Sequence, residues 1–385
     1  MLERFDQLSP KDKPIYYMRN YIYLRKFTFI YVDDKFGKDT ISIVKKKMGI
    51  TSDEFFSPFF SDKLYVLSEK FLRGNDVIRY FFDIYLDSNI VSYISRKNNE
   101  SNAHIKDLVK KITQRRPMTS SVNFSPYITE NSLFLQEMPS IVKDNIYDFF
   151  RIMYQNHSRY KLLSWWKTKR SMRNIVKDYK HTFESPYSQS LRYKYKIIFI
   201  VLLKMSLISF TKKSSKNKLI ELIEFQSKKL DFIDIGITEL SATFFGDKNS
   251  IRFFGKIQAG RSDIVEIVEN LTWDIFHFKQ LYENMNFQQI KETDVSIPIM
   301  CSIDKRFLEL KQYMSLQMVA VNKTNGHVIP FYKQKNIKKN LTGEELSKYF
   351  NIGKIADKIM ISRNIDLHDL EVKLKNEILK TNNNE

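Results

Sequence analysis

The stretch YFFDIYLDSNIV, residues 80–91, decides the fold because it joins a strand to a helix at an acidic residue. Residues 81–86 form an apolar run of strand length, and Asp87 or Ser88 can cap a helix that begins directly after it. A second run of this kind, IPIMCSID at 297–304, ends at Asp304. Strands that are apolar throughout are typical of parallel sheets covered by helices on both faces. The sequence therefore predicts an α/β fold with a central, mostly parallel sheet.

Alternating patterns predict two hairpins outside these strands. Residues 26–34 and 40–47 alternate around Gly37, and residues 318–332 contain Asn325-Gly326, which suits a type I′ turn. We expect the chain to be organised in five parts. These are a small α+β N-terminal segment (1–78), the first part of the α/β domain (79–145), a basic helical insertion (146–230), the second part of the α/β domain (231–335) and C-terminal helices (336–385).

Helical spacing of apolar residues predicts helices at about 102–115, 236–246 and 262–285, and another that begins at Ser140. The most membrane-like stretch, IIFIVLLKMSLISF at 197–210, is too short to span hydrocarbon and contains a lysine. We therefore expect a buried helix there and no membrane association. The lone cysteine excludes an internal disulfide, which favours a reducing compartment and a cytoplasmic location.

Positive charge is concentrated in one part of the chain. The formal net charge is +19, and residues 151–218 contain 17 Lys and Arg residues but only two acidic ones. A basic segment with interleaved aromatic residues suits nucleic acid, because lysine and arginine neutralise phosphates while aromatic rings stack on bases. The predicted binding residues are Arg159, Lys161, Trp165, Trp166, Lys167, Lys169, Arg170 and Arg173.

Three acidic residues suggest a metal site. Asp87 and Asp304 each follow an apolar strand, and Asp274 lies in the helical stretch NLTWDIFHFKQL. Ligands of parallel sheets bind beyond the carboxyl ends of the strands, so these distant residues could converge. A carboxylate cluster needs a cation to offset repulsion, and Mg²⁺ or Mn²⁺ prefers oxygen ligands. One or two such ions could activate water and neutralise a scissile phosphate. The chain contains no HExxH zinc motif and no phosphate-binding glycine loop.

These motifs resemble those of the PIN-like nuclease superfamily. Asp87-Ser88-Asn89-Ile90 matches its D-[ST]-N-[IVL] run, Asp274 to His277 match its D-x-x-H helix, and Ser302 to Phe307 match its [TS]-x-D-x-x-[FL] run. The resemblance covers roughly 80–145 and 231–310. It implies a three-layer α/β/α fold, metal binding by Asp87, Asp274 and Asp304, and supporting roles for Asn89 and Ser302.

The resemblance also implies a catalytic glutamate between the first two aspartates. Glu130 lies 43 residues after Asp87, about where the family places it, and Glu239 in DIGITELSATFFGD is the competitor. Both remain candidates, because either helix could direct a carboxylate at the metals. We expect a metal-dependent endoribonuclease that cuts single-stranded RNA, with a toxin or antiviral defence role and a partner or inhibitor as implied possibilities.

Structural roles compete with these functional ones. Asp87 could serve only as a helix cap, His277 could be a packed helix histidine, and Trp273 could belong to the core. Asp304 has no evident need to cap a helix in the sequence pattern, which favours its functional role. The alternative functions are a non-catalytic nucleic-acid-binding protein and a structure-specific DNase on the same fold.

Overall fold

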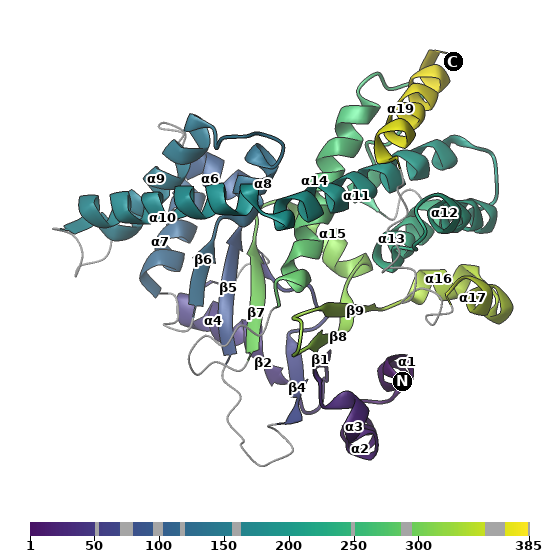
Figure 1. The fold of residues 1–385 in the computed structure, drawn as a ribbon, viewed down its shortest axis with the longest axis horizontal. Helices are drawn as coiled ribbons and strands as arrows, with labels where there is room; N and C mark the ends of the chain where they lie inside the picture. Colours follow the sequence, from purple (N-terminus) through teal and green to yellow (C-terminus); the bar gives the residue numbers. More distant parts are fainter. Residues whose placement is uncertain are drawn as a thin grey trace.

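The computed structural model describes residues 1–50, 54–69, 80–94, 103–115, 120–155, 163–247, 251–285, 295–350 and 366–383. These residues form two sheets and a large set of helices (Figure 1). The chain is therefore a mixed α/β protein, as the sequence predicts. In this part of the chain no helix combines the length and the apolar character needed to cross a membrane.

The four-stranded sheet carries the strands that the sequence identifies. Its order is β3 (Phe55–Phe56), β7 (Val295–Cys301), β5 (Tyr80–Leu86) and β6 (Ser120–Asn123). Strands β7, β5 and β6 are parallel to one another, whereas β3 runs antiparallel to β7. Leu86 lies opposite Cys301 in the register, so β5 and β7 end side by side. The prediction of a mostly parallel sheet is thus confirmed.

Helices follow the strands of this sheet at the expected positions. Their bounds are α6 (Ser88–Ile94), α7 (Ala103–Arg115), α8 (Ser125–Ser132), α9 (Ser140–Gln155), α14 (Ile264–Glu283) and α15 (Lys305–Tyr313). Helices α6, α7 and α9 pack against one another, and α14 packs against β7. The helices predicted at 102–115, from Ser140 and at 262–285 are therefore confirmed.

The second sheet combines strands from the N-terminal segment with strands from residues 316–332. Its order is β2 (Lys38–Asp39), β4 (Lys63–Leu67), β1 (Phe27–Val32), β8 (Leu316–Asn322) and β9 (Val328–Tyr332), and neighbouring strands are antiparallel. The segment 1–78 and the end of the segment 231–335 thus share one sheet. In addition, β3 of the N-terminal segment extends the four-stranded sheet. Long-range strand pairing, which local patterns do not encode, produces this arrangement.

The hairpin predicted for 26–34 and 40–47 is wrong in its second half. Residues 40–48 form α4 (Thr40–Met48), with Asp39 before its first turn and Gly49 after its last. Gly49 has a φ of 65°, a left-handed conformation that glycine adopts without strain and that commonly ends helices. Ile41, Val44 and Met48 are buried along one side, so their helical spacing overrides the apparent alternation.

The β8–β9 hairpin forms where the sequence predicts it, but its turn differs. A type I′ turn requires positive φ at both central residues. Gly326 has a φ of 69°, and Asp231 is the one non-glycine residue with positive φ in the described ranges, so Asn325 does not meet the requirement. The backbone N–H of Gly326 instead donates to the carbonyl of Asn322, which closes a longer loop.

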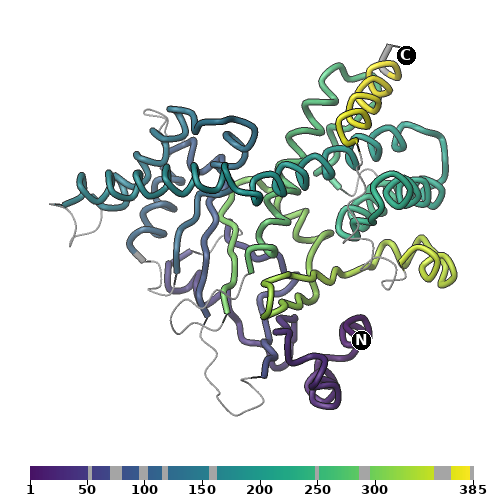
Figure 2. Tube along the Cα trace, in the orientation of Figure 1, coloured from purple at the N-terminus to yellow at the C-terminus, as the bar shows by residue number. Residues whose placement is uncertain are grey.

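Two long helices carry the basic segment. Helix α10 (Ser164–Glu184) and helix α11 (Pro186–Phe210) follow one another across the molecule (Figures 1 and 2). The apolar stretch 197–210 is largely buried within α11, which packs against α14 and α19 (Leu367–Asn383). Its Lys204 donates to Glu221 at 2.9 Å. The expected buried helix is therefore confirmed.

The other helices complete the two ends of the molecule. They are α1 (Leu2–Gln7), α2 (Lys13–Arg19), α3 (Tyr21–Leu24), α12 (Ser215–Lys229), α13 (Ile235–Gly246), the 3₁₀ turn η3 (Arg252–Phe254), α16 (Lys335–Asn340) and α17 (Gly343–Tyr349). The helix predicted at 236–246 corresponds to α13. Both chain termini lie away from the four-stranded sheet (Figure 1).

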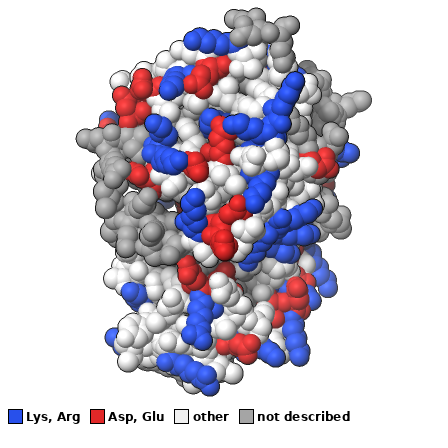
Figure 3. Space-filling model, turned by 90° about the vertical axis from the view of Figure 1, so that its right-hand side faces the viewer, with Lys and Arg blue, Asp and Glu red and all other residues white. Residues whose placement is uncertain are grey.

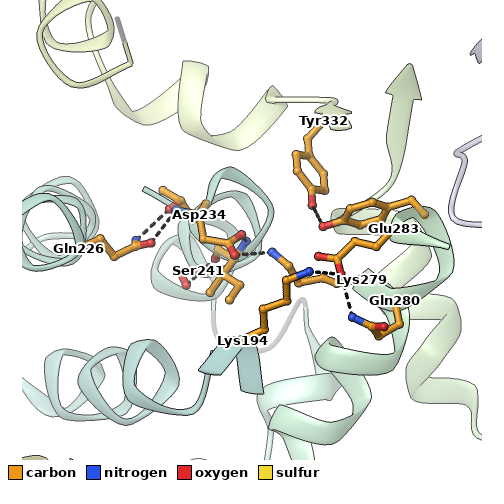
Figure 4. Close-up of polar contacts among 11 residues, drawn as sticks. Lys194, Gln226, Asp234, Ser241, Lys279, Gln280, Glu283 and Tyr332 are labelled. Carbon is orange, nitrogen blue, oxygen red and sulfur yellow. Dashed lines mark hydrogen bonds and ion pairs between the residues drawn. The ribbon is translucent and has the colours of Figure 1, made fainter. Parts of the chain in front are cut away.

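A buried polar network connects α12, α13 and α14 to strand β9 (Figure 4). Lys279 of α14 forms an ion pair with Asp234, and the two side chains are 14% and 7% exposed. Gln226 accepts from the backbone N–H of Asp234 at 2.8 Å. The hydroxyl groups of Tyr282 and Tyr332 lie 2.6 Å apart. These contacts fix the α14 register against the second sheet, and α14 also carries Asp274.

Candidate active site

Asp87 and Asp304 emerge at the same edge of the four-stranded sheet. The backbone N–H of Asp87 donates to the carbonyl of Cys301 at 3.0 Å, which extends the parallel pairing by one residue. Ser302, just after β7, donates to Asp87 Oδ2 at 2.7 Å, and Asn89 donates to the same oxygen at 3.3 Å. The two supporting residues predicted from the sequence thus hold the Asp87 carboxylate.

Asp87 is 4% exposed, and its environment opposes ionisation. Burial raises the pKa of Asp87 to about 6, although the hydrogen bond from Ser302 acts in the opposite direction. The nearby carboxylate of Glu130 raises the pKa further. Asp87 is therefore a buried carboxylate whose surroundings oppose ionisation, and not an exposed helix cap.

Glu130 joins this group from α8, the helix that follows β6. Ser88 donates a short hydrogen bond to Glu130 Oε2, and His277 Nε2 lies 3.4 Å from the same oxygen. Burial acts to raise the pKa of Glu130, but His277 and Ser88 outweigh it and the pKa is lowered. His277 is buried against Trp273, so it is a packed helix histidine that also contacts the site.

Asp274 is a carboxylate whose surroundings oppose its ionisation. Its Oδ2 atom is buried and accepts no hydrogen bond within the described part of the chain. Burial raises the pKa of Asp274 well above its ordinary value, Arg306 opposes this effect, and Asp87, Asp304 and Glu130 add to it. Four carboxylates from distant segments therefore lie close enough for their charges to interact.

Arg306 balances part of this negative charge. Its guanidinium donates two hydrogen bonds to Asp304 Oδ2, at 2.8 Å from Nε and 2.5 Å from Nη2, and Nη2 lies 3.6 Å from Asp274 Oδ2. The expectation that Asp304 has no capping role is wrong. Its Oδ1 accepts from the backbone N–H of Arg306 at 2.9 Å and caps α15. The helix begins directly after β7, so its first turn needs an acceptor there.

Glu239, the competing glutamate, has a different role. Its two carboxylate oxygens accept from the backbone N–H groups of Asn336 at 2.6 Å and Ile337 at 2.9 Å, at the start of α16. Burial raises the pKa of Glu239, and these backbone donors act in the opposite direction. The structure therefore brings Glu130, and not Glu239, to Asp87.

Replacing Glu239 with Ala is expected to lower the free energy of unfolding by about 1–3 kcal/mol, because two buried backbone donors lose their acceptor. Urea denaturation measures this change. Any nucleic-acid cleavage per folded molecule should stay at the wild-type level. A loss of cleavage without a loss of stability would place Glu239 in the active site after all.

The chemistry of the donor set, though not its arrangement, suits a divalent cation. Four carboxylates, with a buried Asp274 oxygen that accepts no hydrogen bond in the described part of the chain, are of the type that Mg²⁺ or Mn²⁺ prefers. Within the described ranges, no three His, Cys, Asp or Glu side chains are arranged as a ready set of metal ligands. Hydrogen bonds from Ser302, Ser88 and Arg306 instead engage Asp87, Glu130 and Asp304. A bound cation would therefore have to displace the Arg306 guanidinium.

The predicted nucleic-acid-binding residues that the structure describes lie on α10. Trp165 and Trp166 are 61% and 47% exposed, although tryptophan is usually buried. Lys169 lies over the Trp165 ring at 4.0 Å, and Arg170 lies over the Trp166 ring at 5.4 Å. Lys167 and Arg173 belong to the same helix. Arg159 and Lys161 lie outside the described residues.

The basic segment is less uniform than its composition suggests. On the side of the molecule in Figure 3, Lys and Arg are interspersed with Asp and Glu. Several lysines near the end of the segment pair with acids outside it, as Lys213 does with Glu221 and Lys216 with Glu345, both at 2.8 Å. The cations on α10 therefore represent the surface better suited to a polyanion.

Sequence reasoning missed three features of the site. Arg306 is a counter-charge to Asp274 and Asp304, Ser88 is a donor to Glu130, and His277 contacts the same glutamate. The role of Ser88 could have been predicted from the Asp87-Ser88-Asn89 run, because Ser88 is the first residue of α6 and follows Asp87 directly. Arg306 carried no such signal, since its partner Asp274 lies in another helix.

Comparisons with known proteins add no family to this description. No protein-family model, curated protein or solved structure matches the chain. The functional argument therefore rests on the residues of this chain and on their geometry.

Proposed function

We propose that this protein is a metal-dependent nuclease of the PIN-like type, with a three-layer α/β/α core, that hydrolyses single-stranded RNA. The observation that carries the proposal is the convergence of Asp87, Glu130 and Asp274 with Asp304 at one sheet edge. Such a cluster costs stability, because burial and mutual repulsion oppose ionisation. A site that is costly to the fold and suited to a cation is best explained by a function.

The side chains divide the work in this proposal. Asp87, Asp274 and Asp304 would hold one or two Mg²⁺ or Mn²⁺ ions, and Glu130 would complete the set. The cation would activate a water molecule and neutralise charge on the scissile phosphate. Ser302 and Asn89 orient Asp87, whereas Ser88 and His277 orient Glu130.

Helix α10 supports the choice of single-stranded RNA. Two exposed tryptophans with cations over their rings can stack on unpaired bases and contact the backbone phosphates at the same time. In a duplex the bases are already stacked on each other and are less accessible to these rings. Structure-specific DNA cleavage by the same fold is the alternative, and the comparison of substrates below tests it.

A non-catalytic nucleic-acid-binding protein is the second candidate. The observation that favours it is the double engagement of Asp304, which caps α15 and pairs with Arg306. In that case the acidic cluster would be structural, and binding by α10 would be the whole activity.

Cleavage of matched single-stranded RNA, single-stranded DNA and duplexes, in Mn²⁺ and in EDTA, separates these functions. We expect RNA to be cut in Mn²⁺, and we expect EDTA, Asp87→Asn and Asp304→Asn each to abolish cutting while RNA binding persists. Tight, salt-sensitive binding with no cleavage in Mn²⁺ would instead favour the non-catalytic function. Preferential cutting of DNA would replace RNA as the substrate.

Replacing Trp165 or Trp166 with Ala is expected to weaken single-stranded RNA binding by about tenfold, because each substitution removes one stacking surface. Fluorescence anisotropy in EDTA measures binding without cleavage. Leu163→Ala is the matched control, since Leu163 is an exposed apolar residue beside the same helix start. Equal losses for Leu163 and the tryptophans would argue against base stacking.

Replacing Arg306 with Met is expected to tighten Mn²⁺ binding by about tenfold, because the variant lacks the guanidinium that competes for Asp304 and Asp274. Titration of Mn²⁺ followed by electron paramagnetic resonance measures free ion directly. Lys305→Met, which removes an exposed neighbouring charge, is the control. Unchanged or weaker Mn²⁺ binding by the Arg306 variant would contradict a cation site between these carboxylates.

A further inference from the structure

A cavity of about 540 Å³ lies on the face of the four-stranded sheet beside the candidate site. Asp83 and Tyr85 of β5 line this cavity. Side chains along a strand point alternately to its two faces, so these residues share a face with Asp87. Helices α8, α10, α11 and α14 form its walls. His277 lines the cavity and also contacts Glu130 at 3.4 Å, so the cavity and the acidic cluster meet at this residue.

The charge of the lining limits what the cavity can hold. In the described part of the chain its lining includes the carboxylates of Asp83 and Asp178 but no Lys or Arg. A phosphate group would be repelled there, because nothing offsets its charge. Asp83 accepts from Ser121 and from Ser296 at 3.0 Å, which fixes its carboxylate on the cavity floor. Amino groups, by contrast, would find acceptors.

The size and chemistry of the lining suit a neutral ring. Phe124 and Leu133 provide apolar surface, and Asn123, Gln280 and Asn284 provide amide donors and acceptors. Pockets of 300–1,000 Å³ with mostly apolar walls and a few polar groups are typical of small-molecule sites. A single nucleobase with its ribose is well within this size.

We propose that this cavity binds one nucleobase of the substrate and favours bases with an exocyclic amino group, so that the adjoining phosphodiester lies at the acidic cluster. This inference deepens the proposed nuclease function and rests on it. Adenine at N6 and cytosine at N4 present such amino groups to carboxylate acceptors, and guanine presents one at N2, whereas uracil has none. Residues on both sides of the junction between α10 and α11 line the cavity, so the two helices would both contact the bound base.

Tyr187 allows a direct test of whether the cavity binds a base. It lies in the first turn of α11, is 49% exposed and lines the cavity, so it can stack on an entering base. Tyr193 lies on the same helix, is 45% exposed and is not part of the lining. The pair therefore compares the same residue type, exposure and helix inside and outside the cavity.

The test measures binding of adenosine, cytidine, uridine, ribose 5-phosphate and spermidine by isothermal titration calorimetry in EDTA. We expect adenosine and cytidine to bind at least about tenfold more tightly than uridine, from the loss of one amino contact. Tyr187→Ala should weaken adenosine binding by about tenfold, and Tyr193→Ala should leave it unchanged. Circular dichroism of both variants checks that they fold.

Three results would overturn the nucleobase site. These are no nucleoside binding by the wild-type protein, binding of ribose 5-phosphate or spermidine as tight as that of adenosine, and equal effects of the two tyrosine substitutions. RNA cleavage by the same preparation in Mn²⁺ keeps the two proposals distinct. Cleavage without nucleoside binding removes only the base site, whereas the expected nucleoside binding without cleavage removes only the nuclease.

Discussion

Asp87→Asn is expected to abolish RNA cleavage and, at the same time, to stabilise the metal-free protein at neutral pH. Loss of a carboxylate that holds the cation should reduce cleavage by at least about 100-fold, since such an ion contributes several kcal/mol at the transition state. The gain in stability follows from the burial of Asp87, whose ionised form is disfavoured in the folded protein.

The sign of the stability change depends on pH. Burial raises the pKa of Asp87 to about 6, from an ordinary value of 3.8 that the unfolded chain retains. The folded protein therefore keeps this proton where the unfolded chain has released it, and this contribution to stability is lost as the pH rises from about 4 through 6. Asparagine has no such loss, so its advantage should be near zero at pH 4 and reach about 2–3 kcal/mol above pH 7.

Urea denaturation in EDTA at pH 4.5 and pH 7.5 measures this difference, and cleavage is measured on the same samples. Asp263→Asn is the control, because Asp263 is exposed and pairs with Arg261 at the surface. An Asp87 variant that is less stable at pH 7.5 and still cleaves RNA would identify Asp87 as a structural residue.

Lys279→Met is expected to lower the free energy of unfolding by about 3–5 kcal/mol, because it leaves the buried carboxylate of Asp234 without its counter-charge. Burial acts to lower the pKa of Lys279, but Asp234 outweighs it and the pKa lies above its usual value, so Lys279 keeps its positive charge. Methionine keeps most of the side-chain volume, which separates the loss of charge from the loss of packing.

Chemical denaturation measures this effect, with Lys228→Met as the control. Lys228 pairs with Glu224 on the exposed surface of α12, where solvent screens the interaction, so no measurable change is expected. The double variant Lys279→Met with Asp234→Asn should recover part of the loss, since Asn keeps the oxygen that accepts from Ile237 and carries no charge. No recovery would mean that packing, and not the unpaired charge, explains the single variant.

Local sequence patterns were sufficient to locate the strands and helices whose apolar residues repeat regularly within one continuous segment. Strands β5 and β7 and helices α7, α9 and α14 lie where apolar spacing predicts them. The failure at 40–47 has a local cause as well, because Ile41 and Ile43 alternate as in a strand, whereas Ile41, Val44 and Met48 have helical spacing. Strand pairing excludes the hairpin. Strand β1 pairs with β4 along one edge and with β8 along the other, so no edge is left for residues 40–47.

The candidate site was predictable in part for a similar reason. Asp87 and Asp304 could be brought together from the sequence, because parallel strands end at a common edge. The choice between Glu130 and Glu239 could not be made, since both lie between Asp87 and Asp274 and either helix could direct a carboxylate at the site. The start of α16, about one hundred residues later, engages Glu239 through backbone donors that no local pattern reveals.

The sequence by itself determined the α/β class, the buried nature of 197–210 and the acids that follow β5 and β7. These features depend on side-chain periodicity and on the direction of the chain within one segment. The supporting roles of Asn89 and Ser302 were implied only by the family resemblance. Only the tertiary structure decided that Arg306 balances Asp274, that the N-terminal strands pair with β8, and that α10 and α11 enclose a cavity. Those outcomes depend on which distant segments meet, and packing of the whole chain fixes that choice.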